Sequence, residues 1–64
     1  MFEVVIERWT GPDSTTEYRW SVWRNGYRIE MGNKAFSNSD NCENEALEFC
    51  WKELGQKPDK ITKL

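Results

Sequence analysis

Residues 18–31 read YRWSVWRNGYRIEM, two alternating runs that flank the pair Asn25-Gly26. Side chains of unlike character alternate between Tyr18 and Arg24, as they do in a strand with two different faces. Asn-Gly is the strongest two-residue signal for a hairpin, because a type I′ turn needs a positive φ at both central positions. The stretch therefore predicts an antiparallel hairpin, with Tyr27 to Met31 as its second strand.

Another strand is predicted before this hairpin, in residues 2–9, FEVVIERW. Phe2, Val4 and Ile6 fall on one face, and Glu3, Val5, Glu7 and Trp9 fall on the other, which indicates one buried face. Gly11-Pro12-Asp13 then ends the strand. Across the three strands, alternation assigns the following side chains to the face that we expect to form the core: Phe2, Val4, Ile6, Tyr18, Trp20, Val22, Ile29, Met31 and Phe36.

One helix is predicted to cover that face. Ser37 to Asn41 is a cluster of residues that favour helix starts. Asp40 followed by Glu43 has the spacing of a capping box, and Ser37 or Ser39 could cap the helix instead. Apolar residues then repeat with helical spacing to about residue 54. The expected stripe contains Leu47, Cys50, Trp51 and Leu54, flanked by Cys42, Ala46 and Phe49.

Gly55 and Pro58 are suited to the end of this helix, since glycine favours the C′ position and proline prevents continuation. Lys60 to Leu64 predicts either a frayed end or a short edge strand. The sequence therefore predicts a single α+β domain spanning residues 1–64. Its expected architecture is a three-stranded antiparallel sheet with one α-helix packed on one face, in the order β-β-β-α.

The composition excludes the commonest catalytic and metal centres. The 64 residues include no histidine, which removes the usual general base and most zinc sites. Cys42 and Cys50 would lie about 12 Å apart along a helix, which is too far for a disulfide. We therefore expect both to be small buried hydrophobes. The chain is expected to be no enzyme and to use no cofactor or metal.

The cellular location can also be predicted. No apolar run approaches the roughly 20 residues that cross a bilayer. Met1-Phe2-Glu3 does not begin a basic region followed by an apolar one, so we expect no signal peptide. Unpaired cysteines suit a reducing compartment. These features predict a cytoplasmic protein without membrane contact.

The sheet face that the helix leaves open is the first candidate binding surface. Alternation places Trp9, Arg19, Trp23 and Arg28 on it, and tryptophan and arginine are enriched at interface hot spots. The alternative is that arginine merely stacks on the indoles and shields the sheet. Dimerisation could also use this face, so a monomer and a homodimer both stay open.

The second candidate surface is an acidic helix face with Glu45 and Glu48 directed outward. Such a face could imitate nucleic-acid phosphates and occupy a basic groove in a partner. The alternative is a solvated helix face, since carboxylates near a helix N-terminus are favoured by the helix dipole.

Three resemblances accompany these observations. Tyr18-Arg19-Trp20, Asn25-Gly26, Ile29 and Phe36-Ser37 before a helix resemble the YegP-like family of small domains of unknown function. That resemblance implies a fold and no activity. The loop from Thr10 to Glu17 is longer than in that family, and the helix lacks its glycine-containing pattern. The order of three strands and a helix is also similar to the arm-binding domains of tyrosine recombinases, which bind DNA through the sheet.

The third resemblance is in size and acidic character only. In these respects the chain is similar to the short acidic inhibitors that phages and mobile elements encode, including anti-CRISPR proteins. Together these features predict a non-catalytic protein-binding domain, in its specific form an inhibitor of a host protein complex. The alternative is nucleic-acid binding through the open sheet face. The net charge of −2 gives no general attraction to nucleic acid.

Overall fold

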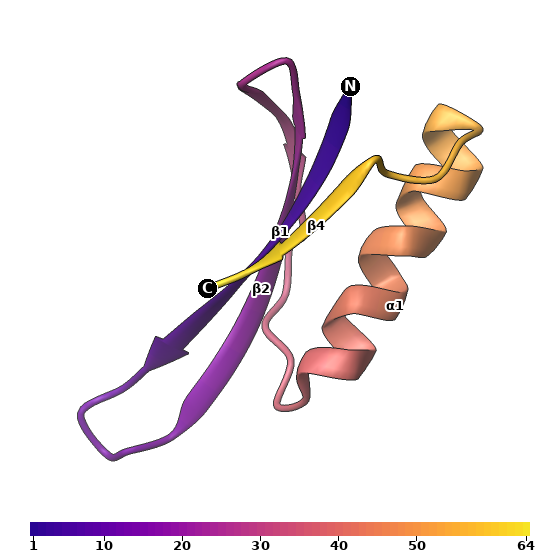
Figure 1. The fold of residues 1–64 in the computed structure, drawn as a ribbon. Helices are drawn as coiled ribbons and strands as arrows, with labels where there is room; N and C mark the ends of the chain where they lie inside the picture. The colour runs from indigo at the N-terminus through magenta and orange to yellow at the C-terminus, as the bar shows by residue number, and fades with distance from the viewer.

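The computed structural model of residues 1–64 contains a four-stranded mixed sheet with one helix on one of its faces (Figure 1). The strands are β1 (Phe2–Thr10), β2 (Thr16–Arg24), β3 (Tyr27–Met31) and β4 (Lys60–Lys63). Their order is β3-β2-β1-β4, with β4 parallel to β1 and the other neighbours antiparallel. The predicted α+β fold is confirmed, and the C-terminal residues form the edge strand.

The helix consists of α1 (Ser39–Phe49) and a wider π-helical turn, η1 (Cys50–Leu54), that continues it. Gly55 ends the helix with a positive φ of 68°, as the sequence predicts. The predicted cap is wrong, because Asn38 caps the helix instead of Asp40, Ser37 or Ser39. The extended backbone of Asn38 lets its side-chain oxygen accept hydrogen bonds from the Asp40 and Asn41 amides, at 2.8 and 3.1 Å.

The core lies between this helix and the sheet. Its buried hydrophobic residues are Phe2, Val4, Ile6, Trp20, Val22, Cys42, Ala46 and Cys50. The helix therefore contacts the sheet through small side chains spaced four residues apart, which lets the two layers approach closely. Trp20 fills the space between them and packs against Phe49, with ring centroids 5.4 Å apart.

Trp51 does not join the core, which corrects the predicted apolar stripe. Because Cys42, Ala46 and Cys50 face the sheet, the next position along the helix turns away from it. Trp51 is 64% exposed, and Leu47 is only half-buried.

The third strand departs from its predicted register. Asn25 and Gly26 both have positive φ, so the predicted hairpin turn is present. A β-bulge then shifts the pairing, since Trp23 lies opposite Arg28 while Val22 lies opposite Glu30. Ile29 is the extra residue of this bulge. The side chains that follow it, Glu30 and Met31, therefore point to the faces opposite to those predicted.

Two predictions about the faces of β3 are therefore wrong. Glu30 lies on the helix side, beside Val22, instead of on the open face. Met31 lies opposite Ser21 on the open face and is 47% exposed, and Ile29 is also exposed, so neither belongs to the core.

The β1–β2 hairpin extends beyond the helix as an arm, visible at the lower left of Figure 1. Its pairing is regular from Phe2 opposite Arg24 to Thr10 opposite Thr16. Near its tip, Trp9 lies opposite Glu17, on the face away from the helix. No helix in the structure has both the length and the apolar character needed to span a membrane.

Candidate binding surfaces

The centre of the open sheet face is a row of side chains from adjacent strands. Val5 lies opposite Ser21, and Ser21 lies opposite Met31. The Trp23 indole nitrogen donates a hydrogen bond of 2.9 Å to the Ser21 hydroxyl, which is 4% exposed. Trp23 is consequently half-buried against the face, so it both stabilises the sheet and contributes to its surface.

Next to this row is a hollow of about 360 Å³ on the open face. Trp9, Arg19 and Arg28 line it together, so three of the four residues predicted for this surface meet around one depression. Met31 also lines it, because the bulge turns this side chain outward. Trp9 is 55% exposed. The sequence pattern alone missed Met31, since a bulge leaves no mark in a strictly alternating strand.

The two arginines of this surface do not stack on its indoles. Arg24 lies over the Phe2 ring and Lys34 over the Phe36 ring, and these are the cation–π contacts of the molecule. Arg19 instead lies 3.7 Å from the Glu17 carboxylate, with both side chains about half exposed. Such an exposed pair holds its partners weakly. The guanidinium groups therefore keep donors that can bind an incoming molecule.

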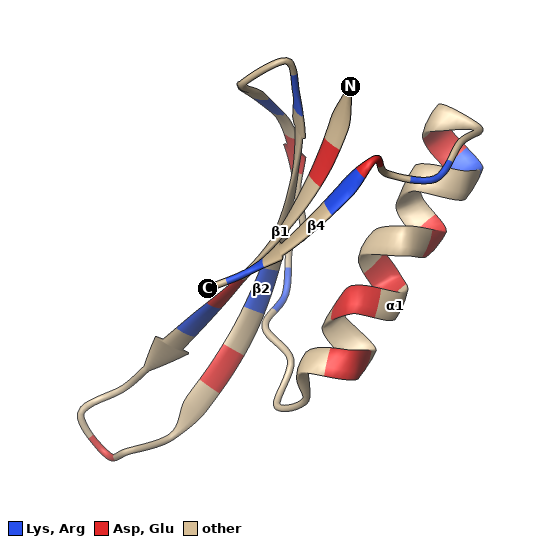
Figure 2. Ribbon diagram, viewed as in Figure 1, with Lys and Arg blue, Asp and Glu red and all other residues tan.

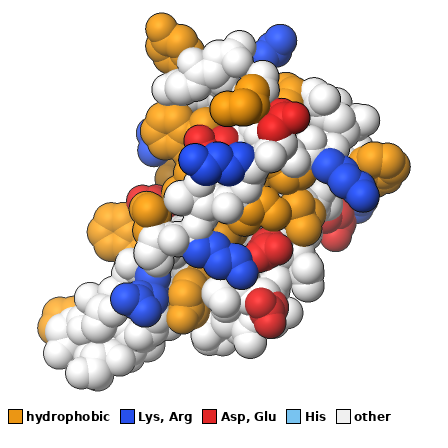
Figure 3. All heavy atoms as spheres, in the orientation of Figure 1, with side chains coloured by type: hydrophobic (Ala, Val, Ile, Leu, Met, Phe, Trp, Pro, Cys, Tyr) orange, Lys and Arg blue, Asp and Glu red, His pale blue; other side chains and the backbone are white.

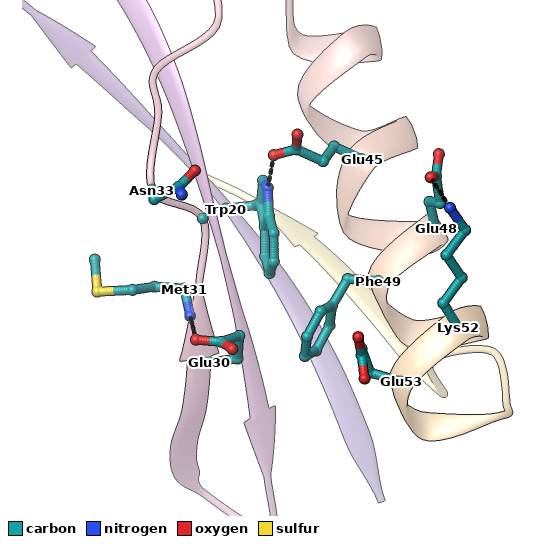
Figure 4. Close-up of a pocket in the computed structure, with 10 residues that line it drawn as sticks. Trp20, Glu30, Met31, Asn33, Glu45, Glu48, Phe49, Lys52 and Glu53 are labelled. Carbon is teal, nitrogen blue, oxygen red and sulfur yellow. Dashed lines mark hydrogen bonds and ion pairs between the residues drawn. The ribbon is translucent and has the colours of Figure 1, made fainter.

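The acidic helix face differs from its prediction. Glu45 is half-buried instead of directed outward, and it accepts a 2.8 Å hydrogen bond from the Trp20 indole nitrogen (Figure 4). Its other oxygen lies 3.6 Å from the Lys34 ammonium group. Glu48 is exposed but forms a 2.6 Å ion pair with Lys52, and this contact lowers the pKa of Glu48. Both predicted residues thus have a lysine as a neighbour, although these pairs are exposed and weak.

Glu45, Glu48 and Lys52 line a second hollow, of about 410 Å³, between β3 and the helix. Its floor contains Trp20 and Phe49, and Glu30 reaches it because of the bulge. Figure 4 shows Glu30 on the side of β3 that faces Phe49, while the Met31 side chain points away from the helix. Glu45 serves mainly to hold the buried indole in place.

The two cysteines are free and buried, as predicted. Burial raises the pKa of both thiols, and the charge of Glu45 raises that of Cys42 further. A raised pKa keeps a thiol protonated and unreactive at neutral pH. The structure contains no group of three or more His, Cys, Asp or Glu side chains that could hold a metal ion.

Comparisons with protein-family models, with curated proteins and with solved structures found no match to this chain. The resemblance to the YegP-like family therefore stays a prediction from short motifs.

Proposed function

We propose that this chain is a non-catalytic protein-binding domain that docks through its open sheet face. The observation that carries the proposal is the meeting of Trp9, Arg19 and Arg28 around one hollow that no element of the fold covers. Large aromatic and guanidinium side chains supply most of the binding energy in protein interfaces. Met31 adds an adaptable apolar contact beside them.

The charges on this face favour a protein partner over nucleic acid. Arg19, Arg28 and Lys60 lie on it, and they are balanced by carboxylates of the same face: Glu3, Glu7 and Glu17. A surface that binds phosphate groups needs an excess of positive charge, and this one has none. A mixed surface with exposed apolar groups at its centre is instead typical of protein interfaces.

Within this class, the specific form that we propose is an inhibitor of a host protein complex, encoded by a phage or mobile element and similar in style to anti-CRISPR proteins. Its support is the small, acidic character of the chain, with a pI of about 5.0. The domain would act by occupying a surface of its target, since it offers no histidine for acid–base chemistry.

The test compares two indoles with similar exposure on different surfaces. Tagged wild-type protein, Trp9→Ala and Trp51→Ala would each be used to capture partners from a host lysate treated with nuclease. We expect wild type and Trp51→Ala to retain a saturable partner and Trp9→Ala to lose at least about 30-fold in affinity for it. Trp9 is preferable to Trp23, whose indole also supports Ser21.

Three outcomes would contradict the proposal. Equal capture by Trp9→Ala would place the partner elsewhere. Affinity that disappears after nuclease treatment and falls steeply with salt would identify nucleic acid as the ligand. Light scattering that shows a dimer, dissociated by Trp9→Ala, would mean that the open face binds a second copy of the chain.

A further inference from the structure

A second hydrophobic surface lies on the other side of the sheet, between the end of the helix and β4. Leu47, Trp51, Pro58 and Ile61 line a groove of about 480 Å³ there. Trp51 is 64% exposed and Ile61 is 39% exposed. Figure 3 shows hydrophobic side chains between the helix and β4 on this face. The groove contains none of the residues of the open face.

The groove runs beside the free edge of the sheet, because β4 is the outermost strand. Ile61 lies opposite the buried Val4, so its side chain points to the helix side and into the groove. Lys60 and Thr62 point to the other face, opposite Glu3 and Val5. An extended segment paired with β4 would therefore place every second side chain in the groove.

The charged groups around this edge include carboxylates, but Glu48 in the groove is paired with Lys52 and Glu43 is paired with Lys63 of β4, which leaves two lysines without an ion pair. Lys57 lines the groove and Lys60 begins β4, and neither belongs to any of the four ion pairs of the molecule. The nearby carboxylate of Asp59 already accepts a 2.8 Å hydrogen bond from the Phe2 amide. Figure 2 shows basic residues at both ends of β4. An acidic occupant matches these charges.

A second copy of the chain fits this edge poorly. Pairing β4 with β4 of another molecule would bring Lys60 and Lys63 of both copies close together. Like charges on neighbouring strands destabilise the pairing, and lysine on an edge strand is a common means of preventing self-association.

We propose that an extended acidic segment of a partner protein adds to β4 as a fifth strand and inserts an apolar side chain beside Trp51. This interaction uses none of the residues that line the hollow around Trp9. Backbone hydrogen bonds would supply part of the affinity, and the groove and the lysines would select a segment in which acidic and apolar residues alternate.

The experiment uses three fluorescein-labelled heptapeptides and measures binding by fluorescence anisotropy. The first alternates glutamate with valine, the second replaces its glutamates by lysine, and the third replaces the central valine by proline. We expect the acidic peptide to bind the wild-type chain. The lysine peptide should fail because of its charge, and the proline peptide should bind weakly because it lacks a strand donor.

Variants of the chain complete the test. Trp51→Ala should weaken binding of the acidic peptide by about 30-fold, and Lys60→Glu should weaken it by about two- to fivefold. Trp9→Ala is the control and should leave this affinity unchanged, so failure here can be told apart from failure of the proposed function. Equal binding of the acidic and lysine peptides, or full binding to Trp51→Ala, would overturn the proposal. A dimer that Trp51→Ala dissociates would do so as well, by identifying a second copy as the occupant.

Discussion

Gly32→Ala should be among the most destabilising single substitutions in this protein. Gly32 follows β3 and lies against the flat side of the buried Trp20 indole. A methyl group at this position would meet the Trp20 indole nitrogen at 2.5 Å and its Cε2 atom at 2.8 Å. Ordinary carbon contacts lie at about 3.5–4.0 Å, so the indole would have to move by about 1 Å.

The indole has little freedom to move. Trp20 is 5% exposed, packs against Phe49 and donates its 2.8 Å hydrogen bond to Glu45. Overpacking of a core costs about 1–3 kcal/mol, and losing a hydrogen bond to a charged group costs about 1.5–3 kcal/mol. Because the ring can relieve part of the clash by giving up this bond, we expect a total of about 2–4 kcal/mol. That is a large part of the roughly 3–10 kcal/mol that a domain of this size possesses.

The assay is urea denaturation followed by far-UV circular dichroism, in a double-mutant cycle with Trp20→Phe. The phenylalanine ring lacks the nitrogen that meets the new methyl group, so Gly32→Ala should cost at least about 1 kcal/mol less in that background. An equal cost in both backgrounds would refute the proposed clash. A cost below about 0.5 kcal/mol in the wild-type background, the range of ordinary surface substitutions, would refute it too.

The other predictions concern the helix cap, the anchoring of β4 and the thiols. Asn38→Ala should lower the free energy of unfolding by about 1 kcal/mol, measured in urea, and no change would contradict the assigned cap. Asp59→Ala leaves the Phe2 amide without its acceptor and should lower the free energy of unfolding by about 1–2 kcal/mol. A thermal melt that matches that of wild type would contradict this expectation. The thiol pKa values of Cys42 and Cys50 are raised in the folded state, so unfolded thiols ionise first. Stability should be retained below pH 9.0, the ordinary thiol pKa, and fall as the pH rises past it. A double Cys→Ala variant should lose that decline between pH 9 and 10, and an identical decline would assign it to other groups.

The sequence predicted the elements of this fold well, because each has a local signal. Asn25-Gly26 can form its turn whatever surrounds it, and Gly55 ends the helix in the same way. The burial of Phe2, Val4 and Ile6 follows from simple alternation. These patterns depend on backbone geometry within a few residues, so one sequence suffices to find them.

The incorrect predictions concern residues whose position depends on packing between elements. Nothing in the regular alternation of β3 reveals the bulge at Ile29, which depends on how the strand pairs with β2. The same bulge moved Glu30 to the helix side and Met31 to the open face. Trp51 matches a helical stripe by spacing, but close approach to the sheet favours the smaller Cys42 and Cys50.

The candidate surface was predicted correctly only where local alternation determines which face a side chain occupies. Trp9, Arg19 and Arg28 lie on β1, β2 and the first residues of β3, where alternation holds. Glu45 was misjudged because its orientation depends on the buried indole of Trp20, a contact between residues far apart in the chain. The groove beside β4 could not be found, since it forms only when the C-terminal strand docks.

The two exposed indoles are the strongest reason to expect two partners rather than one. Covering an indole removes about 150–250 Å² from water, at about 25 cal/mol per Å². With 55% of Trp9 and 64% of Trp51 exposed, burial of each residue could contribute roughly a further 2–4 kcal/mol. That amount equals the contribution of an interface hot spot. Because Trp9 lies on the open face and Trp51 on the helix side, we expect one compact partner not to cover both indoles, so the two proposed interactions should involve separate occupants.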